Sequence, residues 1–121
     1  MTTALRVLVP DVDEALPAWR GLGYEVRERW GPPFAILGGP GIDVWLSGPE
    51  TSAAQISAGL EPAVQAAAST RLVTITETFD QHERDLQAAG WQPLTERRAG
   101  PGGLQRLLRQ GDTVLECFSP G

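Results

Sequence analysis

The chain has 121 residues, of which 41% are hydrophobic and 21% are charged, a composition typical of one compact globular domain. Ten arginines and no lysine stand against fifteen acidic residues, giving a formal charge of -5 at pH 7. An acidic chain argues against nucleic acid and against an anionic membrane as partners. The absence of lysine excludes Schiff-base chemistry and a lysine-dependent phosphate loop.

The sequence holds one cysteine, Cys117, and one histidine, His82. These counts exclude an internal disulfide and a two-histidine metal site. The first residues lack the basic and apolar regions of a secretory signal, and no stretch of about 18 apolar residues occurs. We therefore expect a cytoplasmic protein with no membrane association.

The first predicted elements are a strand and a helix. Residues 3–9 are rich in β-branched and aliphatic side chains and end at a proline, which predicts a strand followed by a turn. Asp11 or Asp13 can cap a helix whose apolar residues fall near helical spacing and which ends at Gly23. Pro17 fits such a helix only within about its first turn.

Three strands and a linker follow. The strands are separated by turns rich in glycine and proline and span residues 24–30, 34–37 and 42–46. Residues 48–70 are rich in Ser, Ala, Gly and Pro and carry only two charges, so they predict a linker with at most one or two helical turns.

The second half repeats this order of elements. A strand over 71–77 and a helix over 79–89 precede three further strands, predicted over residues 91–98, 104–109 and 113–118. Overlaying the halves places Leu5 on Leu72 and Gly23 on Gly90. Each half therefore predicts the same β-α-β-β-β unit.

Such a unit has an open sheet with one face covered by its helix and the other face bare, so two units pair to bury the bare face. We predict a single α+β domain over residues 1–121. Its modules, 3–47 and 71–119, are joined by the linker 48–70. They form a cupped, half-open mixed β-sheet barrel with the helices outside, and the concave face is the natural pocket.

Several motifs, in this order and spacing, resemble the vicinal oxygen chelate superfamily, which includes glyoxalases, bleomycin-resistance proteins and extradiol dioxygenases. They are Val9-Pro10-Asp11-Val12-Asp13 and Leu22-Gly23-Tyr24 in the first half, and in the second half residues 85–91, 100–103 and 114–118, which look like the superfamily's helix end, hairpin turn and last strand. The resemblance implies the paired-module fold, pairing of two copies into a homodimer, and a cup that holds a small molecule or a divalent metal.

Enzymes of this superfamily mostly hold their metal with His, Glu or Gln from four strands. The matching positions here are Ala4, Leu46, Arg71 and Glu116. Ala4 and Leu46 have no donor atom and Arg71 is a permanent cation, which leaves Glu116 as the one possible ligand. We expect no metal site and no cofactor, and a buried Arg71–Glu116 ion pair in their place. Alternatively, Arg71 binds a carboxylate or phosphate of the ligand while Glu116 positions it.

Strand alternation directs one side of the first strand of each half into the cup, where aromatic residues beside the hairpins join it. Mostly apolar side chains with a few charges suit an apolar organic ligand. Packing in the core or in a dimer explains the aromatic residues equally well. The predicted ligand-binding residues are Arg6, Leu8, Trp30, Phe34, Trp45, Arg71, Val73, Ile75 and Glu116.

The predicted function is that of a metal-free small-molecule binding protein of the glyoxalase/bleomycin-resistance type, which sequesters an apolar or aromatic drug or metabolite in the cup. One alternative is a metal-dependent isomerase, lyase or dioxygenase. Another is a metal-free enzyme that uses Arg71, Glu77 or Glu116. A third is an interaction module whose cup is filled by its own side chains. His82 is expected to be exposed or half-exposed on a helix, and Cys117 to be a small buried hydrophobe.

Overall fold

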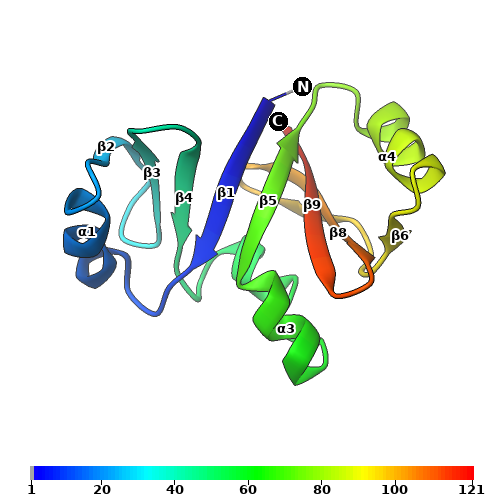
Figure 1. The fold of residues 1–121 in the computed structure, drawn as a ribbon, viewed down its shortest axis with the longest axis horizontal. Coiled ribbons are helices and arrows are strands. Elements are labelled where there is room, and N and C mark those ends of the chain that lie inside the picture. The colour runs from blue at the N-terminus through cyan, green and yellow to red at the C-terminus, as the bar shows by residue number, and fades with distance from the viewer. Residues whose placement is uncertain (1) are drawn as a thin grey trace.

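A computed structural model describes residues 2–121 of the chain (Figure 1). The first half contains four strands and one helix. In chain order these are β1 (Thr2–Leu8), α1 (Val12–Arg20), β2 (Glu25–Arg29), β3 (Phe34–Gly38) and β4 (Asp43–Ser47). Asp11 caps α1, since its carboxylate accepts a hydrogen bond from the N–H of Glu14 at 3.0 Å. Pro17 lies in the second turn of α1, later than predicted, and the helix ends three residues beyond it.

The linker forms more helix than predicted. It contains α2 (Ser52–Gln55) and α3 (Pro62–Ala68). The Thr51 side chain caps α2 by accepting from the N–H of Ala54, and Pro62 begins α3, where its missing N–H costs nothing. Two local signals, a threonine cap and a proline at a helix start, therefore specify helices within an alanine-rich segment that has little hydrophobic periodicity.

The second half contains one helix and five strands. In chain order these are β5 (Thr70–Ile75), α4 (Phe79–Ala88), β6 (Gln92–Pro93), β7 (Arg98–Gly100), β8 (Gly103–Gln110) and β9 (Thr113–Pro120). The strand predicted over residues 91–98 is wrong, because only the short β6 and β7 form there. Pro93 has no N–H for the ladder, and the Thr95 hydroxyl takes the N–H of Leu107 that a neighbouring strand would otherwise bond.

The nine strands of the described chain form one mixed sheet in the order β2-β3-β4-β1-β5-β9-β8-β6, with β7 also pairing with β8. In each half the first strand is parallel to the last strand, β1 to β4 and β5 to β9. The halves meet where β1 and β5 run antiparallel, a line called the seam below. The strand order does not close on itself, so the predicted α+β fold with a half-open mixed sheet is confirmed.

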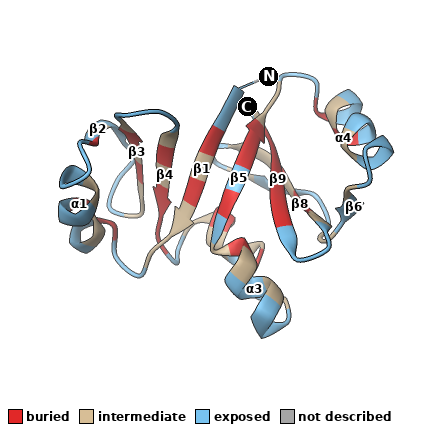
Figure 2. Ribbon diagram, in the orientation of Figure 1, coloured by how far each residue is buried: buried red, intermediate tan, exposed pale blue. Residues whose placement is uncertain are grey.

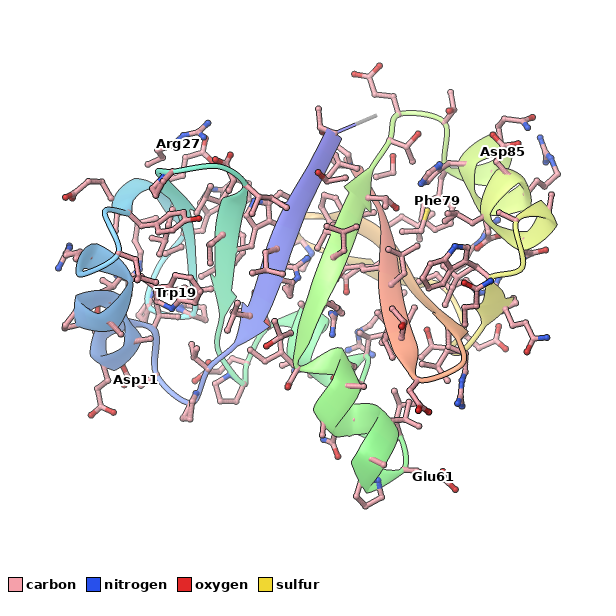
Figure 3. The ribbon with its side chains drawn as sticks, in the orientation of Figure 1. Asp11, Trp19, Arg27, Glu61, Phe79 and Asp85 are labelled. Atoms are coloured by element: carbon pink, nitrogen blue, oxygen red, sulfur yellow. The ribbon has the colours of Figure 1, made fainter. Side chains whose placement is uncertain are left out.

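Helices α1 and α4 lie at opposite ends of the molecule, each beside its own half of the sheet (Figures 1 and 2). The core under α1 is entirely apolar and contains Val12, Leu16, Tyr24, Ala35, Leu37, Val44 and Leu46. The core under α4 is smaller and contains Phe79, Leu108 and Cys117. Trp19 and Phe79 lie on the sides of their helices that face the sheet (Figure 3). No helix within residues 2–121 has the length and apolar character needed to cross a bilayer.

Candidate functional site

The concave side of the sheet holds a cavity of about 420 Å³, called the cup below, which is lined by both halves of the chain. Strands β1, β3 and β4 contribute from the first half, strands β5, β8 and β9 from the second, and the segment 50–53 closes one side. A volume of this size lies within the range of small-molecule binding pockets. The cavity lies on the face of the sheet away from α1 and α4, as predicted, and the linker helix α2 contributes Ser52 and Ala53 to it.

Four aromatic side chains form a continuous edge-to-face series along the cup. The ring centroids lie 6.3 Å apart for Trp30 and Phe34, 6.0 Å for Phe34 and Trp45, and 5.3 Å for Trp45 and Phe118. Such contacts hold rings in defined orientations. Trp30 is 56% exposed, so its ring presents a large apolar surface at the solvent side of the series.

Local structure explains why these rings face the cup. The N–H of Trp30 bonds the carbonyl of Phe34 at 3.0 Å, closing a tight hairpin in which Gly31 takes a φ of 68°. Along β3 and β4, alternation then directs Phe34 and Trp45 into the cup, while Leu37 and Leu46 pack under α1.

This register corrects the assignment of Leu46 as a position matching a metal ligand. Leu46 is fully buried on the opposite face of the sheet, and its neighbour Trp45 faces the cup. Ala4 packs with Val73 on the cup side but does not approach Glu116. Arg6, two residues further along β1, holds that position. A one-residue shift in the register of a strand moves every side chain to the other face of the sheet. The sequence alone does not fix this register where no turn constrains it.

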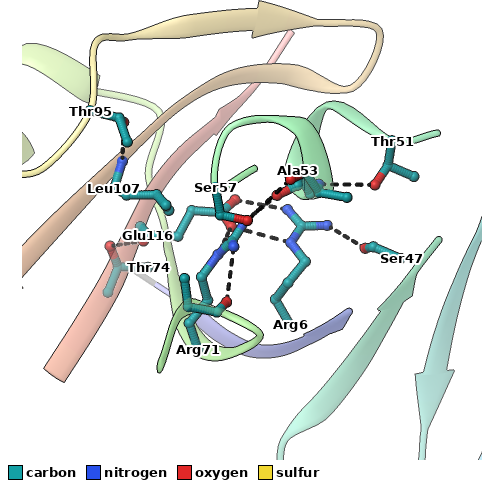
Figure 4. A network of polar contacts seen from close by, with 12 residues as sticks. Arg6, Ser47, Thr51, Ala53, Ser57, Arg71, Thr74, Thr95, Leu107 and Glu116 are labelled. Carbon is teal, nitrogen blue, oxygen red and sulfur yellow. Dashed lines mark hydrogen bonds and ion pairs between the residues drawn. The ribbon is translucent and has the colours of Figure 1, made fainter. Parts of the chain in front are cut away.

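Glu116 lies at the centre of a buried ion cluster with two arginines (Figure 4). Arg6 donates to both carboxylate oxygens, from Nε to Oε1 at 3.2 Å and from Nη2 to Oε2 at 2.7 Å. Arg71 donates from Nε to Oε1 at 2.9 Å. The predicted Arg71–Glu116 ion pair is present. The second arginine was not anticipated as its partner, although β1 and β5 set Arg6 directly opposite Arg71 at the seam.

The remaining donors of the cluster tie the linker to the sheet. Arg71 donates from Nη1 to the carbonyl of Ala68 at 3.0 Å and from Nη2 to the carbonyl of Ala53 at 2.9 Å. Arg6 donates from Nη1 to the Ser47 hydroxyl at 3.1 Å. Since Ala68 ends α3 and Ala53 lies in α2, the cluster fixes both linker helices against the seam.

Burial and charge act in opposite directions on these groups. Burial disfavours ionisation of Glu116, but Arg6 and Arg71 outweigh it and hold the pKa of the carboxyl below its ordinary value. Burial lowers the pKa of the Arg71 guanidinium, and the attraction of Glu116 opposes that effect. Both guanidiniums are permanent cations. The carboxyl is therefore ionised between two cations.

The residues of this site do not fit a divalent metal. Both oxygens of Glu116 already accept hydrogen bonds from guanidiniums, and the side chains beside it, Arg6, Arg71 and Trp45, offer no donor to a metal. Among residues 2–121, no group of three or more His, Cys, Asp or Glu side chains is arranged to hold a metal ion.

The structure brings together only some of the predicted ligand-binding residues. Arg6, Trp30, Phe34, Trp45 and Ile75 line the cup. Behind that surface, Arg71 and Glu116 form the ion cluster, and Val73 is fully buried. Leu8 lies outside the cup, where its N–H bonds the carbonyl of Ser69 at the end of β1.

Sequence reasoning missed Gln105 and the segment 50–53 as parts of the cup. Gln105 is 3% exposed, and its Oε1 has no hydrogen-bond partner within residues 2–121. Buried amides are ordinarily bonded, so this one is available to a ligand. The sequence marks it only weakly, since the next residue, Arg106, is also polar, and its place in the cup follows from its pairing with Phe118 of β9.

His82 and Cys117 lie on the helix side of the sheet, away from the cup. His82 is half-buried, and its Nε2 lies 2.9 Å from the Thr74 hydroxyl. Burial lowers the pKa of His82, against the attraction of Asp85. Cys117 is fully buried, as predicted, and burial together with Glu83 and Glu116 raises the pKa of its thiol to about 12. A thiol in this environment is a poor nucleophile at neutral pH.

No protein-family model matches the sequence, and no curated protein does. Solved structures match over almost the whole chain. A glyoxalase/bleomycin resistance protein/dioxygenase superfamily member from Vibrio splendidus 12B01 is 14% identical with a TM-score of 0.58, with 97% of each chain covered. Methylmalonyl-CoA epimerase from Mycobacterium tuberculosis is 18% identical with a TM-score of 0.58, covering 98% of this chain and 86% of the other.

A third structure, described as NAD-dependent benzaldehyde dehydrogenase from Legionella pneumophila, is 14% identical with a TM-score of 0.72, covering 98% of this chain and 99% of the other. Identities this low establish the fold alone. The chain has the vicinal oxygen chelate fold, that of the glyoxalase/bleomycin resistance protein/dioxygenase superfamily, and the predicted resemblance is confirmed at that level.

Proposed function

We propose that the protein binds a small, flat organic molecule in the cup and does so without a metal ion. The observation that carries this proposal is the series of Trp30, Phe34, Trp45 and Phe118 along a cavity of about 420 Å³. Aromatic walls with few polar groups favour aromatic and apolar ligands. The role that this lining favours is sequestration of the ligand, because aromatic and aliphatic side chains form most of the wall.

Binding is tested with 1-naphthamide, a neutral planar probe, followed through the indole N–H resonances of the four tryptophans in ¹⁵N-labelled protein. Trp30 and Trp45 line the cup, whereas Trp19 and Trp91 pack under α1 and α4. We expect saturable shifts for the first pair and little change in the second. Shifts of similar size at all four, or shifts that do not saturate, would contradict binding in the cup.

A matched pair of variants locates the binding further. Phe34→Ala removes the ring between Trp30 and Trp45, and we expect roughly ten-fold weaker binding of 1-naphthamide, since loss of an aromatic contact costs about 1 kcal/mol or more. Phe79→Ala removes a buried ring under α4 and outside the cup, so it lowers stability but leaves the affinity unchanged. Equal losses of affinity in the two variants would point to general loosening of the fold.

The metal-free part of the proposal rests on Glu116, whose carboxylate is already bonded to Arg6 and Arg71. We expect no rise in the melting temperature when Mn²⁺, Ni²⁺ or Zn²⁺ is added to chelator-treated protein. Specific binding to the folded state would raise it by mass action. A rise with one metal that is lost in Glu116→Gln would favour the metal-dependent enzyme.

A homodimer and a cytoplasmic location stay predictions. Light scattering on the purified protein measures the mass in solution and so tests the first of these directly.

A further inference from the structure

The buried ion cluster carries an unbalanced charge. Arg6 and Arg71 contribute two positive charges and Glu116 one negative charge, so the three groups sum to one positive charge. All three residues are at least 97% buried, since the most exposed, Arg6, is 3% exposed. Within residues 2–121, neither arginine forms an ion pair with another carboxylate. An uncompensated buried charge is costly, and a group that pairs with it is correspondingly favoured.

The two arginines differ in what they can offer a ligand. Each guanidinium donates one hydrogen bond from each of its three nitrogens, but Arg71 lies behind the wall of the cup, where its partners are Glu116 and two main-chain carbonyls. Arg6 lines the cup itself. Arg6 donates one hydrogen bond from each nitrogen and so uses three of its five N–H groups. One N–H on Nη1 and one on Nη2 remain for a ligand.

The aromatic series passes over the same guanidinium. The central carbon of Arg6 lies 5.0 Å from the ring centroid of Trp45 and 5.8 Å from that of Phe34. These rings stabilise the cation but do not neutralise it. A flat ligand that contacts Phe34 and Trp45 therefore lies beside the positive charge.

Gln105 supplies a second polar group in the same cavity. Its side chain is buried, lines the cup and has an unpartnered Oε1. As placed, this oxygen accepts a hydrogen bond, and turning the terminal amide by 180° exchanges the oxygen and the NH₂. In that second orientation Gln105 donates a hydrogen bond to a ligand oxygen.

Resting on the proposed function, we infer that the ligand is an aromatic anion, with a carboxylate or an equivalent oxyanion that pairs with Arg6 and is assisted by the Gln105 amide. The aromatic series binds the ring, and the anion neutralises the cluster. The net charge of -5 favours a cationic ligand at long range, whereas the cluster favours an anion inside the cup. Glu50, whose side chain is exposed and also contacts the cup, disfavours a second negative charge near it.

Calorimetric titration with three probes of one ring system tests the inference: 1-naphthoate, 1-naphthamide and 1-naphthylmethylammonium. The first two have nearly the same shape and differ in charge. We expect 1-naphthoate to bind roughly ten-fold more tightly than 1-naphthamide, as a charge-assisted hydrogen bond allows. The ammonium probe should bind more weakly than either.

Variants assign the preference to the cup. Gln105→Glu keeps the shape of the side chain and adds a negative charge to the wall of the cup. It breaks no hydrogen bond at Oε1, because that atom has no partner. We expect this substitution to abolish the preference, so that the affinity for 1-naphthoate relative to 1-naphthamide falls to about one or below. Arg6→Met should do the same if it folds. Arg20→Met removes one positive charge from the exposed surface of α1 and should keep the preference.

The outcomes separate the two proposals. Equal affinity for 1-naphthoate and 1-naphthamide overturns the anion preference but leaves a binding cup in place. Loss of the preference in Arg20→Met to the same extent as in Gln105→Glu also overturns it, since net charge would then explain the effect. Failure of all three probes to bind overturns both this inference and the proposed function.

Discussion

The two halves of the molecule share one topology but stabilise it differently. Under α1 the first half has seven buried residues, all of them apolar or aromatic. Under α4 the second half has three such residues and, beside them, a set of ion pairs from Glu83 to Arg97 and Arg106. The repeated order of strands therefore constrains the path of the chain and the side on which each helix packs, and it does not require equivalent cores.

The two halves also contribute different kinds of side chain to the cup and to the ion cluster behind it. The first half provides three of the four rings in the aromatic series, and the second half provides Phe118, Gln105 and the carboxylate of Glu116. A pocket between two related units gains chemical variety because each unit supplies a different kind of group. The ion cluster at the seam is where the halves depend on each other most directly.

The largest expected loss of folding stability therefore comes from a substitution at the seam. Glu116→Gln leaves Arg6 and Arg71 facing each other without a carboxylate, and loss of one partner from a buried ion cluster costs about 3–5 kcal/mol in the free energy of unfolding. Urea denaturation at pH 7 measures this. Asp43→Asn, which breaks an exposed pair with Arg27, is the control and should cost well under 1 kcal/mol. A similar cost for both substitutions would contradict a special role for the cluster.

The next effect compares the two helix-side cores. Leu37→Ala should cost about 3 kcal/mol or more, because it removes buried contacts from the larger of the two cores. Leu108→Ala should cost about 2 kcal/mol, because fewer buried residues pack around it. Both leucines are fully buried, so the two values are directly comparable by denaturation. The reverse order would show that the core under α4 is the more rigid one.

A smaller effect is expected from pH. Burial disfavours ionisation of Glu83, but its bonds from Arg97 and Arg106 hold the pKa of its carboxyl below the ordinary value. The pKa of Glu116 is lowered in the same direction. A carboxyl with a lowered pKa in the folded state contributes stability that is complete above its unfolded pKa, about 4.3, and is lost as the pH falls further.

The melting temperature should therefore fall steeply below about pH 4.5. Glu83→Gln should reduce the slope and cost about 1 kcal/mol at pH 7, a value limited by the solvent around Arg97. Asp13→Asn, which removes an exposed carboxylate bonded to Arg29, is the control and should cost well under 1 kcal/mol at pH 7. If Glu83→Gln has the same acid dependence as the parent protein, the ion pairs under α4 contribute nothing to it.

The smallest effect compares the starts of the two helices. Asp11 caps α1 with its side chain, whereas Thr78 makes no side-chain cap to α4. Asp11→Ala should cost about 1 kcal/mol and Thr78→Ala less than half as much. Thermal denaturation of both variants tests the difference. A larger cost for Thr78→Ala would show that its hydroxyl contact with Thr76 matters more than capping does.

The sequence predicts the fold better than the site, for physical reasons. Strands bounded by Gly31 and by Pro10, and helices that end near glycine, are specified by local conformational preferences. The register of β4 depends on pairing with β3 and β1, which no local signal encodes, and so Leu46 was assigned to the face that Trp45 occupies.

Contacts between segments far apart in the sequence were harder to predict than the register of the strands. Arg6 faces the cup in the prediction, but its bond to Glu116 joins residues 110 positions apart. Gln105 enters the cup because β8 pairs with β9, and the segment 50–53 does so because Arg71 bonds the carbonyl of Ala53. The positions of these residues follow from the packing of the two halves against each other. The hydrophobic periodicity of either half does not predict them.

The separation between Arg6 and Glu116 also bears on how the chain folds as it is made. Synthesis delivers β1 first, then β5, which pairs with β1 and sets a second arginine opposite the first. Until residue 116 has been added, the seam holds two like charges with no carboxylate between them, and this disfavours its closure. The early chain therefore keeps the seam open and hydrated, and burial of both arginines waits for the last strand.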